Sequence, residues 1–129
     1  MSLQPLYRII KRVEGKLTPT VVTAAATLTT AQALAGVVVS NVGASAAVTF
    51  VLPPAQPGMR VEAIVEAAQE LRLDPSGTET VALPSSGVQG AAGKYLVADA
   101  IGESVVLRCV TAGTWSVVGP IDGTWTAEA

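Results

Sequence analysis

Hydrophobic and polar positions alternate along much of the chain with the two-residue period of a β-strand. In the clearest run, residues 59–66, Met59, Val61, Ala63 and Val65 fall on one face and a more polar set falls on the other. This pattern is typical of a strand with one face in the core and one face toward solvent. Further strands are predicted at residues 37–41, 47–52, 70–74, 79–83, 94–98, 104–110, 114–118 and 124–127.

Glycine and proline separate these predicted strands. The connections at residues 99–103, 111–113 and 120–123 are short and contain glycine, which favours hairpins. Short strands with such turns between them are typical of sandwiches and barrels. The sequence therefore predicts an all-β fold, an antiparallel β-sandwich, jelly-roll or barrel-like domain over residues 18–129, preceded by an extended N-terminal arm.

Two segments favour a helix instead. Residues 30–36 fit one helical turn, with Thr30 as the N-cap and Gly36 as the left-handed residue that ends it. Residues 62–72 contain Glu-Ala-Ala-Gln-Glu-Leu-Arg, which has high helix propensity. A helix across residues 62–72 is the main alternative to the all-β prediction.

The N-terminal arm, residues 1–17, differs in charge from the rest of the chain. Residues 1–16 carry four basic residues and one acidic residue, whereas residues 17–129 carry four basic and nine acidic residues. The apolar positions of the arm fit a helical stripe and also one face of a strand. A basic arm on an acidic body predicts a segment that docks on an acidic partner, which could be nucleic acid, a protein surface or a neighbouring copy. The candidate docking residues are Leu6, Tyr7, Arg8, Ile9, Ile10, Lys11, Arg12 and Val13.

Composition adds a prediction about assembly. Hydrophobic residues make up 50% of the chain and charged residues only 14%, against about 25% charged residues in an average soluble domain. Part of this apolar excess is expected to lie between subunits, and the alternative is a monomer with an alanine-rich core. Because the body is acidic, we do not expect nucleic acid as a partner.

Residue types that build catalytic and metal sites are scarce. The chain has no histidine, the commonest general base and metal ligand. Its single cysteine, Cys109, lies in an alternating run and is expected in the core. Glu62 and Glu66 share the polar face of a strand with Arg60, a solvated pattern and not a cleft. We therefore expect no enzyme activity, no catalytic residues, no metal and no cofactor.

Membrane and export signals are also missing from the sequence pattern. No stretch approaches the about 20 consecutive apolar residues of a membrane-spanning helix. The N-terminus lacks the order of charge, apolar run and cleavage site that marks a signal peptide. We expect no membrane partner and no export by the usual route.

Gly-Thr-Trp occurs twice, at residues 113–115 and 123–125. Trp115 is predicted to fill the core, which otherwise consists of small side chains. For Trp125, close to the C-terminus, two interpretations stay open. It could close one end of the core, or it could be a surface aromatic on which a sugar ring stacks.

The order of these motifs resembles the small all-β modules of tailed-bacteriophage virion proteins, namely capsid decoration (cement) proteins and tail-fibre domains. The resemblance covers about residues 18–127 and is carried by residues 52–58, 71–81, 93–95 and 113–125. It implies a homotrimer that binds the major capsid protein on the outer capsid surface and stabilises the head. It also implies manufacture in the host cytoplasm, a final location in the virion, and an arm that reaches along the capsid. The alternative is a tail-fibre, receptor-binding or carbohydrate-binding module.

Overall fold

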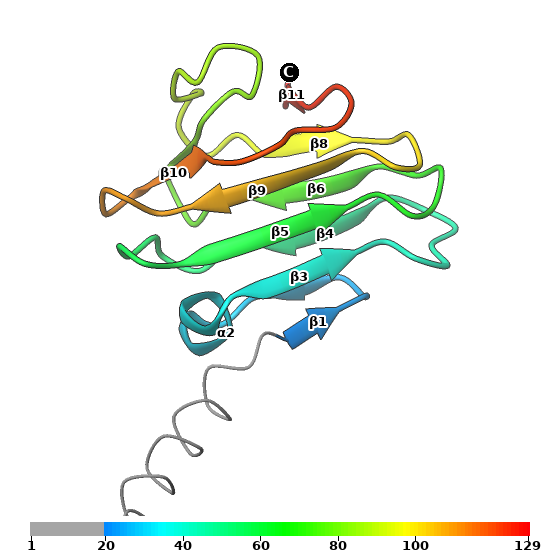
Figure 1. The fold of residues 1–129 in the computed structure, drawn as a ribbon, viewed down its shortest axis with the longest axis horizontal. Coiled ribbons are helices and arrows are strands. Elements are labelled where there is room, and N and C mark those ends of the chain that lie inside the picture. The colour runs from blue at the N-terminus through cyan, green and yellow to red at the C-terminus, as the bar shows by residue number, and fades with distance from the viewer. Residues whose placement is uncertain (1–19) are drawn as a thin grey trace, which may run out of the picture.

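The computed structural model describes residues 20–129, and almost all of their regular secondary structure is strand (Figure 1). The strands are β1 (Thr20–Val22), β2 (Ala26–Thr27), β3 (Val37–Ser40), β4 (Val48–Val51), β5 (Arg60–Ile64), β6 (Leu71–Asp74), β7 (Thr80–Val81), β8 (Leu96–Ala98), β9 (Ser104–Arg108), β10 (Thr114–Val117) and β11 (Thr126–Ala127). Within these residues the one helix is α2 (Thr30–Ala35). The all-β prediction is confirmed, and the alternative helix over residues 62–72 is replaced by β5 and β6.

The strands form two sheets, which lie one in front of the other in Figure 1. The six-stranded sheet has the order β1-β3-β5-β9-β10-β7, and the five-stranded sheet has the order β11-β8-β6-β4-β2. From β1 to β6 the chain alternates between the two sheets, so that odd-numbered strands lie in one sheet and even-numbered strands in the other. Among these six strands, neighbours in the same sheet are parallel.

The prediction of antiparallel sheets was therefore wrong in part, because both sheets are mixed. Parallel neighbours need a long crossover, which in many folds is a helix. Here a strand of the opposite sheet provides the crossover. The path from β3 to β5 passes through β4, and the path from β4 to β6 passes through β5. A two-residue period predicts a strand but does not say which strand lies beside it.

Most pairings of the C-terminal strands are antiparallel, and the exception is β10, which pairs in parallel with the edge strand β7. β9 pairs with β5 and with β10, and β8 pairs with β6 and with β11. Residues 111–113 connect β9 to β10 as the predicted hairpin. The segments at 99–103 and 120–123 were also predicted as hairpins, but each crosses from one sheet to the other.

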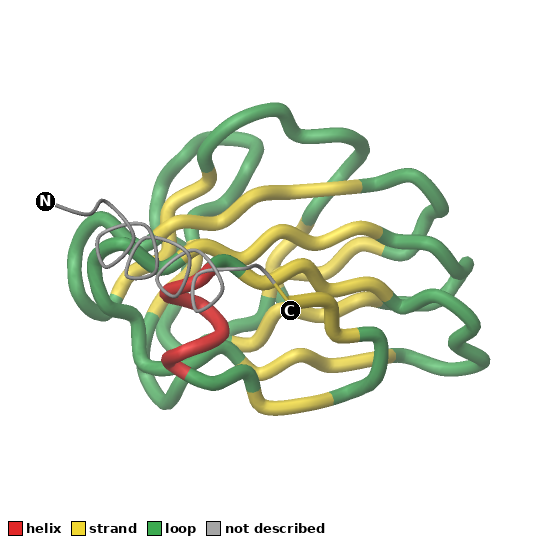
Figure 2. Tube along the Cα trace, turned by 60° about the horizontal axis from the view of Figure 1, so that its bottom comes forward, coloured by secondary structure: helices red, strands yellow, loops and turns green. Residues whose placement is uncertain are grey.

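Loops gather at both ends of the sheets, and the short helix lies among the loops at one of these ends (Figure 2). Its N-cap is Thr29, one residue before the predicted Thr30. The Thr29 hydroxyl accepts a hydrogen bond from the Gln32 backbone N–H, and the Gln32 side chain accepts one from the Thr29 N–H. This reciprocal capping box fixes where the helix begins. Gly36 follows the last helical residue with a φ of 89°.

Buried side chains from both sheets form one hydrophobic cluster. Its largest fully buried members include Trp115, Phe50, Leu71, Leu73 and Leu107. Cys109 belongs to the same cluster with 3% of its surface exposed, as the alternating pattern predicted. The inward positions of β5 and β6 are those that the sequence pattern placed on the apolar face.

One fully buried polar residue, Asn41, holds the loop between β5 and β6 against the end of β3. Its side-chain amide donates to the carbonyl oxygens of Ala67 and Gln69 at 3.1 and 2.9 Å. Its side-chain oxygen accepts from the backbone N–H groups of Glu66 and Ala67 at 2.8 and 3.0 Å. All the donors and acceptors of the side chain are thus used, as a buried amide requires.

Candidate functional site

The residues singled out in the sequence have different outcomes. The arm residues from Leu6 to Val13 lie outside the described residues. Trp125, considered as a surface aromatic, is 4% exposed and belongs to the core, so that interpretation was wrong. Its indole Nε1 donates to the carbonyl oxygen of Ser104 at 3.0 Å. A ring in this position has no free face for a sugar, because both faces are packed in the core.

Trp115 occupies the core as predicted, with none of its surface exposed. The two tryptophans differ in their polar atoms. Whereas the indole of Trp125 is hydrogen-bonded, the Nε1 of Trp115 is buried without a hydrogen-bond partner among the described residues. Such a group costs about 1–3 kcal/mol, so the burial of the ring must outweigh it.

The carboxylates considered for catalysis do not form a pair. Glu62 lies 3.5 Å from the Arg60 guanidinium, and Glu66 accepts a hydrogen bond of 2.5 Å from the Ser40 hydroxyl.

The single cysteine is poorly suited to nucleophilic chemistry. Burial and, secondarily, the Glu79 carboxylate raise the pKa of the Cys109 thiol, which makes the reactive thiolate scarcer. Residues 20–129 contain no group of three or more side chains suited to a metal ion.

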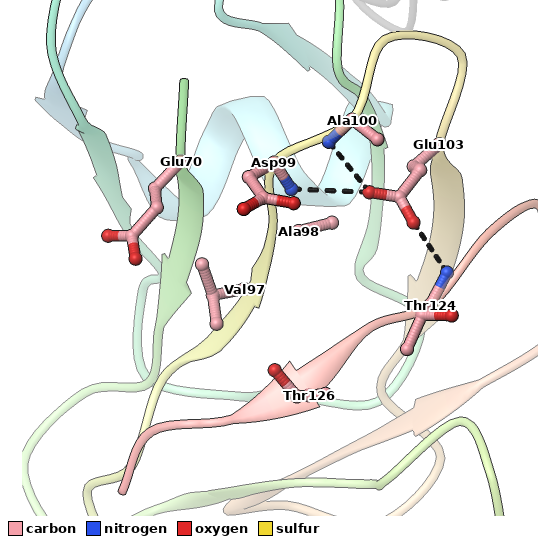
Figure 3. Close-up of a pocket in the computed structure, with 8 residues that line it drawn as sticks. All are labelled: Glu70, Val97, Ala98, Asp99, Ala100, Glu103, Thr124 and Thr126. Carbon is pink, nitrogen blue, oxygen red and sulfur yellow. Dashed lines mark hydrogen bonds between the residues drawn. The ribbon is translucent and has the colours of Figure 1, made fainter. Parts of the chain in front are cut away.

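A surface pocket of about 240 Å³ lies where the loop after β8 meets the C-terminal segment (Figure 3). It is lined by Glu70, Val97, Ala98, Asp99, Ala100, Glu103, Thr124 and Thr126. Figure 3 shows Glu103 on one side of the pocket and Glu70 on the other. Carboxylates and hydroxyls dominate its polar rim, which suits a ligand with several hydroxyl groups.

The Glu103 carboxylate is the best-held group of the pocket. One oxygen accepts from the backbone N–H groups of Asp99 and Ala100 at 3.2 and 2.8 Å, and the other accepts from the N–H of Thr124. Burial alone would raise the pKa of Glu103, but the hydrogen bonds from Thr124, Ala100 and Asp99 outweigh it and hold the pKa below its ordinary value. Glu103 thus stays charged and ties the C-terminal segment to the turn before β9.

Gly123, the glycine of the second Gly-Thr-Trp, makes this arrangement possible. It has a φ of 82°, and a Cβ built on it would overlap Cγ, Cδ and Oε2 of Glu103. In the second Gly-Thr-Trp, Gly123 leaves space for the Glu103 side chain, and the Thr124 N–H donates a hydrogen bond to it. Trp125 places its ring in the core. Sequence reasoning missed Glu103, because a single acidic residue in a predicted turn carries no pattern. The repeated glycine was the available signal.

Comparisons with known proteins identify no relative. No family model matches the chain, no curated protein matches it, and no solved structure matches it. Within residues 20–129, no helix is both long and apolar enough to cross a membrane.

Gly123→Ala is expected to destabilise the protein by about 2–3 kcal/mol, because left-handed strain adds to the displacement of Glu103 from its donors. Gly119 is the matched control, since its φ is 81° and a Cβ there would meet nothing within 4 Å. Gly119→Ala should cost about 1 kcal/mol, from backbone strain alone. Urea unfolding of the two variants measures the difference, and equal midpoints would contradict the role of Gly123.

Acid should weaken the Glu103 tether. A carboxylate whose pKa is lowered in the folded state stabilises that state above its unfolded pKa, about 4.3 for glutamate, and loses this contribution as the pH falls through the folded value. Wild type should therefore be more stable than Glu103→Gln at pH 7, and the difference should shrink below pH about 4. Unfolding free energies measured across this range test the expectation. A free-energy difference between the two proteins that is the same at pH 7 and below pH about 4 would contradict the charged tether.

Proposed function

We propose that this chain is a non-enzymatic capsid decoration (cement) protein of a tailed bacteriophage, which binds the outer capsid surface as a homotrimer and stabilises the head. The observation that carries the proposal is how the body uses its polar side chains. Asn41, Glu66 and Glu103 all hydrogen-bond to backbone or to a neighbouring strand. These contacts tie loops and the C-terminal segment to the sheets, as a brace requires. The motif resemblance supports the same function.

The packing of the two sheets also supports this proposed function. We infer that the two sheets pack as a β-sandwich, because buried residues of both belong to one cluster. The alternation of the chain between the sheets gives many long-range contacts, so that pulling on one strand loads both sheets. A protein that braces a shell against internal pressure benefits from such a body.

In this proposal the arm, residues 1–17, which precedes β1 in the sequence, docks on the major capsid protein. Its four basic residues against one acidic residue favour an acidic docking surface. The protein would be made in the host cytoplasm and would function in the virion. Neither a cofactor nor a metal is part of the proposed function.

A second candidate is a tail-fibre, receptor-binding or carbohydrate-binding module. The pocket beside Glu103 favours it, because Glu70, Asp99, Thr124 and Thr126 offer oxygen acceptors and donors to a sugar. Titration with a panel of monosaccharides and host surface glycans, monitored through the NMR signals of these residues, tests this candidate. Saturable binding there would favour recognition over decoration.

Deleting residues 1–17 should leave the body folded and remove most of its binding to capsids. In this proposal the body folds without the arm, since residues 20–129 contain two paired sheets and a hydrophobic cluster between them. Docking should also weaken as salt rises, since exposed charges are screened beyond about 8 Å at physiological ionic strength. Thermal unfolding and capsid co-sedimentation of the truncated protein are the measurements. A truncated protein that fails to fold, or that binds as strongly as the full chain, would reject the docking role.

A further inference from the structure

One side of the body ends in two edge strands that follow each other in the chain. β1 is an edge strand of the six-stranded sheet, and β2 is an edge strand of the five-stranded sheet. Only residues 23–25 separate the two, so both edges lie on the same side, at the bottom of Figure 1. We call residues 20–27 the open edge. All of them except Val22 are exposed.

The open edge presents backbone groups that can bind a further strand. Among residues 20–129, β3 is the one neighbour of β1. The Thr20 N–H donates to the Gly36 carbonyl oxygen at 3.3 Å, on the β3 side. Because successive residues of a strand direct their backbone groups to opposite sides, the N–H and C=O of Val21 point away from the sheet. The backbone groups of an edge strand are a template for pairing with another strand.

The open edge lacks the features with which proteins protect an edge strand. Charged side chains, proline within the strand or a covering loop normally prevent pairing with other chains. Residues 17–59 contain no Asp, Glu, Lys or Arg, and residues 20–27 contain no proline. The edge at β7 is different, because the chain covers it with its own loop. There the N–H groups of Gly90 and Gly93 donate to the carbonyl oxygens of Val81 and Glu79.

The arm that precedes β1 has a sequence suited to this edge. Its residues 6–13 alternate, and one strand face carries Tyr7, Ile9, Lys11 and Val13. Eight residues of strand span about 26 Å, more than the three residues of β1 need. Residues 14–19, which include Gly15, leave a connection in which the chain can turn back. Because the arm is covalently joined to β1, its effective concentration at this edge is high.

We propose that in the free protein residues 6–13 pair with β1 of the same chain and add a strand to the six-stranded sheet. The new edge then carries Arg8, Lys11 and Arg12, charges of the kind that protect an edge and that residues 17–59 lack. The arm thereby has a role before it docks. This inference goes beyond the proposed function, since it concerns the protein before it meets a capsid. Docking then requires the arm to leave β1.

Amide hydrogen exchange of the full chain tests the pairing at a single N–H group. The Val21 N–H points away from β3, so an added strand is needed to protect it. It should exchange at least about tenfold more slowly in wild type than in Ile9→Pro, because proline disrupts the added strand and leaves every charge of the arm in place. Ile9→Val is the matched control and should keep the protection. The Val65 N–H, bonded to the Glu103 carbonyl oxygen at 2.8 Å, should exchange slowly in all three proteins. Equal exchange of Val21 in wild type and Ile9→Pro would overturn the pairing.

A spin label on the arm shows whose arm occupies the open edge. In a Cys109→Ser background, Arg12→Cys provides one thiol for a nitroxide label. The label should broaden the amide signals of residues 20–22 in the chain that carries it. In a mixture of labelled protein with unlabelled, ¹⁵N-enriched protein, these signals should be unchanged. Broadening in the mixture would assign the edge to the arm of a second copy and overturn pairing within one chain. Unchanged signals in both samples would overturn pairing of the arm altogether.

Neither measurement uses a capsid, so the outcomes separate this inference from the proposed function. A chain whose arm protects Val21 but which does not bind capsids would overturn the decoration role and leave the pairing in place. A chain that binds capsids through an arm that never pairs with β1 would overturn the pairing and leave the decoration role in place.

Discussion

Asn41→Ala is expected to destabilise the protein by about 3–4 kcal/mol, because four hydrogen bonds with a net value of about 1 kcal/mol each are lost. The lost partners are the carbonyl oxygens of Ala67 and Gln69 and the N–H groups of Glu66 and Ala67. These groups lie in a partly buried loop, so water replaces only some of the bonds. The thermal midpoint should fall by about 10–15 °C.

The matched control is the next residue, Val42, which is 49% exposed. Val42→Ala should change the unfolding free energy by no more than about 0.5 kcal/mol. Asn41→Asp adds a second comparison, because it keeps the acceptor but sets a carboxylate against two carbonyl oxygens. It should be strongly destabilising at neutral pH. If Asn41→Ala unfolds at the same urea concentration as Val42→Ala, the amide is not the tether described above.

Trp125→Ala is expected to cost about 3–5 kcal/mol, as for other large aromatic residues removed from a core. The ring is buried and its Nε1 is bonded to Ser104, so its removal leaves a cavity and frees the C-terminal segment. Because the residue lies near the chain end, part of the cost should appear as local opening of β11 from β8. Amide hydrogen exchange of Thr126 and Ala127 measures that opening.

The control for Trp125 is Thr126→Ala, since Thr126 is exposed on β11. This variant should unfold close to wild type. The competing interpretation, a surface aromatic that binds sugar, predicts the reverse pattern for Trp125→Ala. In that case stability would be unchanged and ligand binding would be lost.

The alternating pattern located most strands but not their neighbours. Residues 59–66 and 70–74 were placed as strands within a few positions of β5 and β6, because burial of one face imposes a two-residue period. The parallel pairing of β3 with β5 depends on the path of the chain through the opposite sheet, and local sequence does not contain it. β1 and β2 were missed because they are short and largely exposed.

The polar tethers show the same limit. Asn41 was placed at the end of the predicted strand 37–41, and its burial depends on a loop about 25 residues later in the chain. Glu103 binds Thr124 across a similar separation. Trp125 illustrates the opposite case, since its position near the C-terminus suggested exposure, whereas the bond to Ser104 fixes it inward. Long-range contacts of this kind decide which polar and aromatic residues hold the fold.

The proposal that this chain decorates a phage capsid is tested most directly by binding to empty, expanded capsids of a tailed bacteriophage. Purified full-length protein should co-sediment with these capsids to a saturating ratio that is a multiple of three per binding position, and should raise their thermal disruption temperature. Binding should be absent with unexpanded shells if the site forms on expansion. Full-length, trimeric protein that neither co-sediments with the expanded capsids nor alters their disruption temperature would contradict the account.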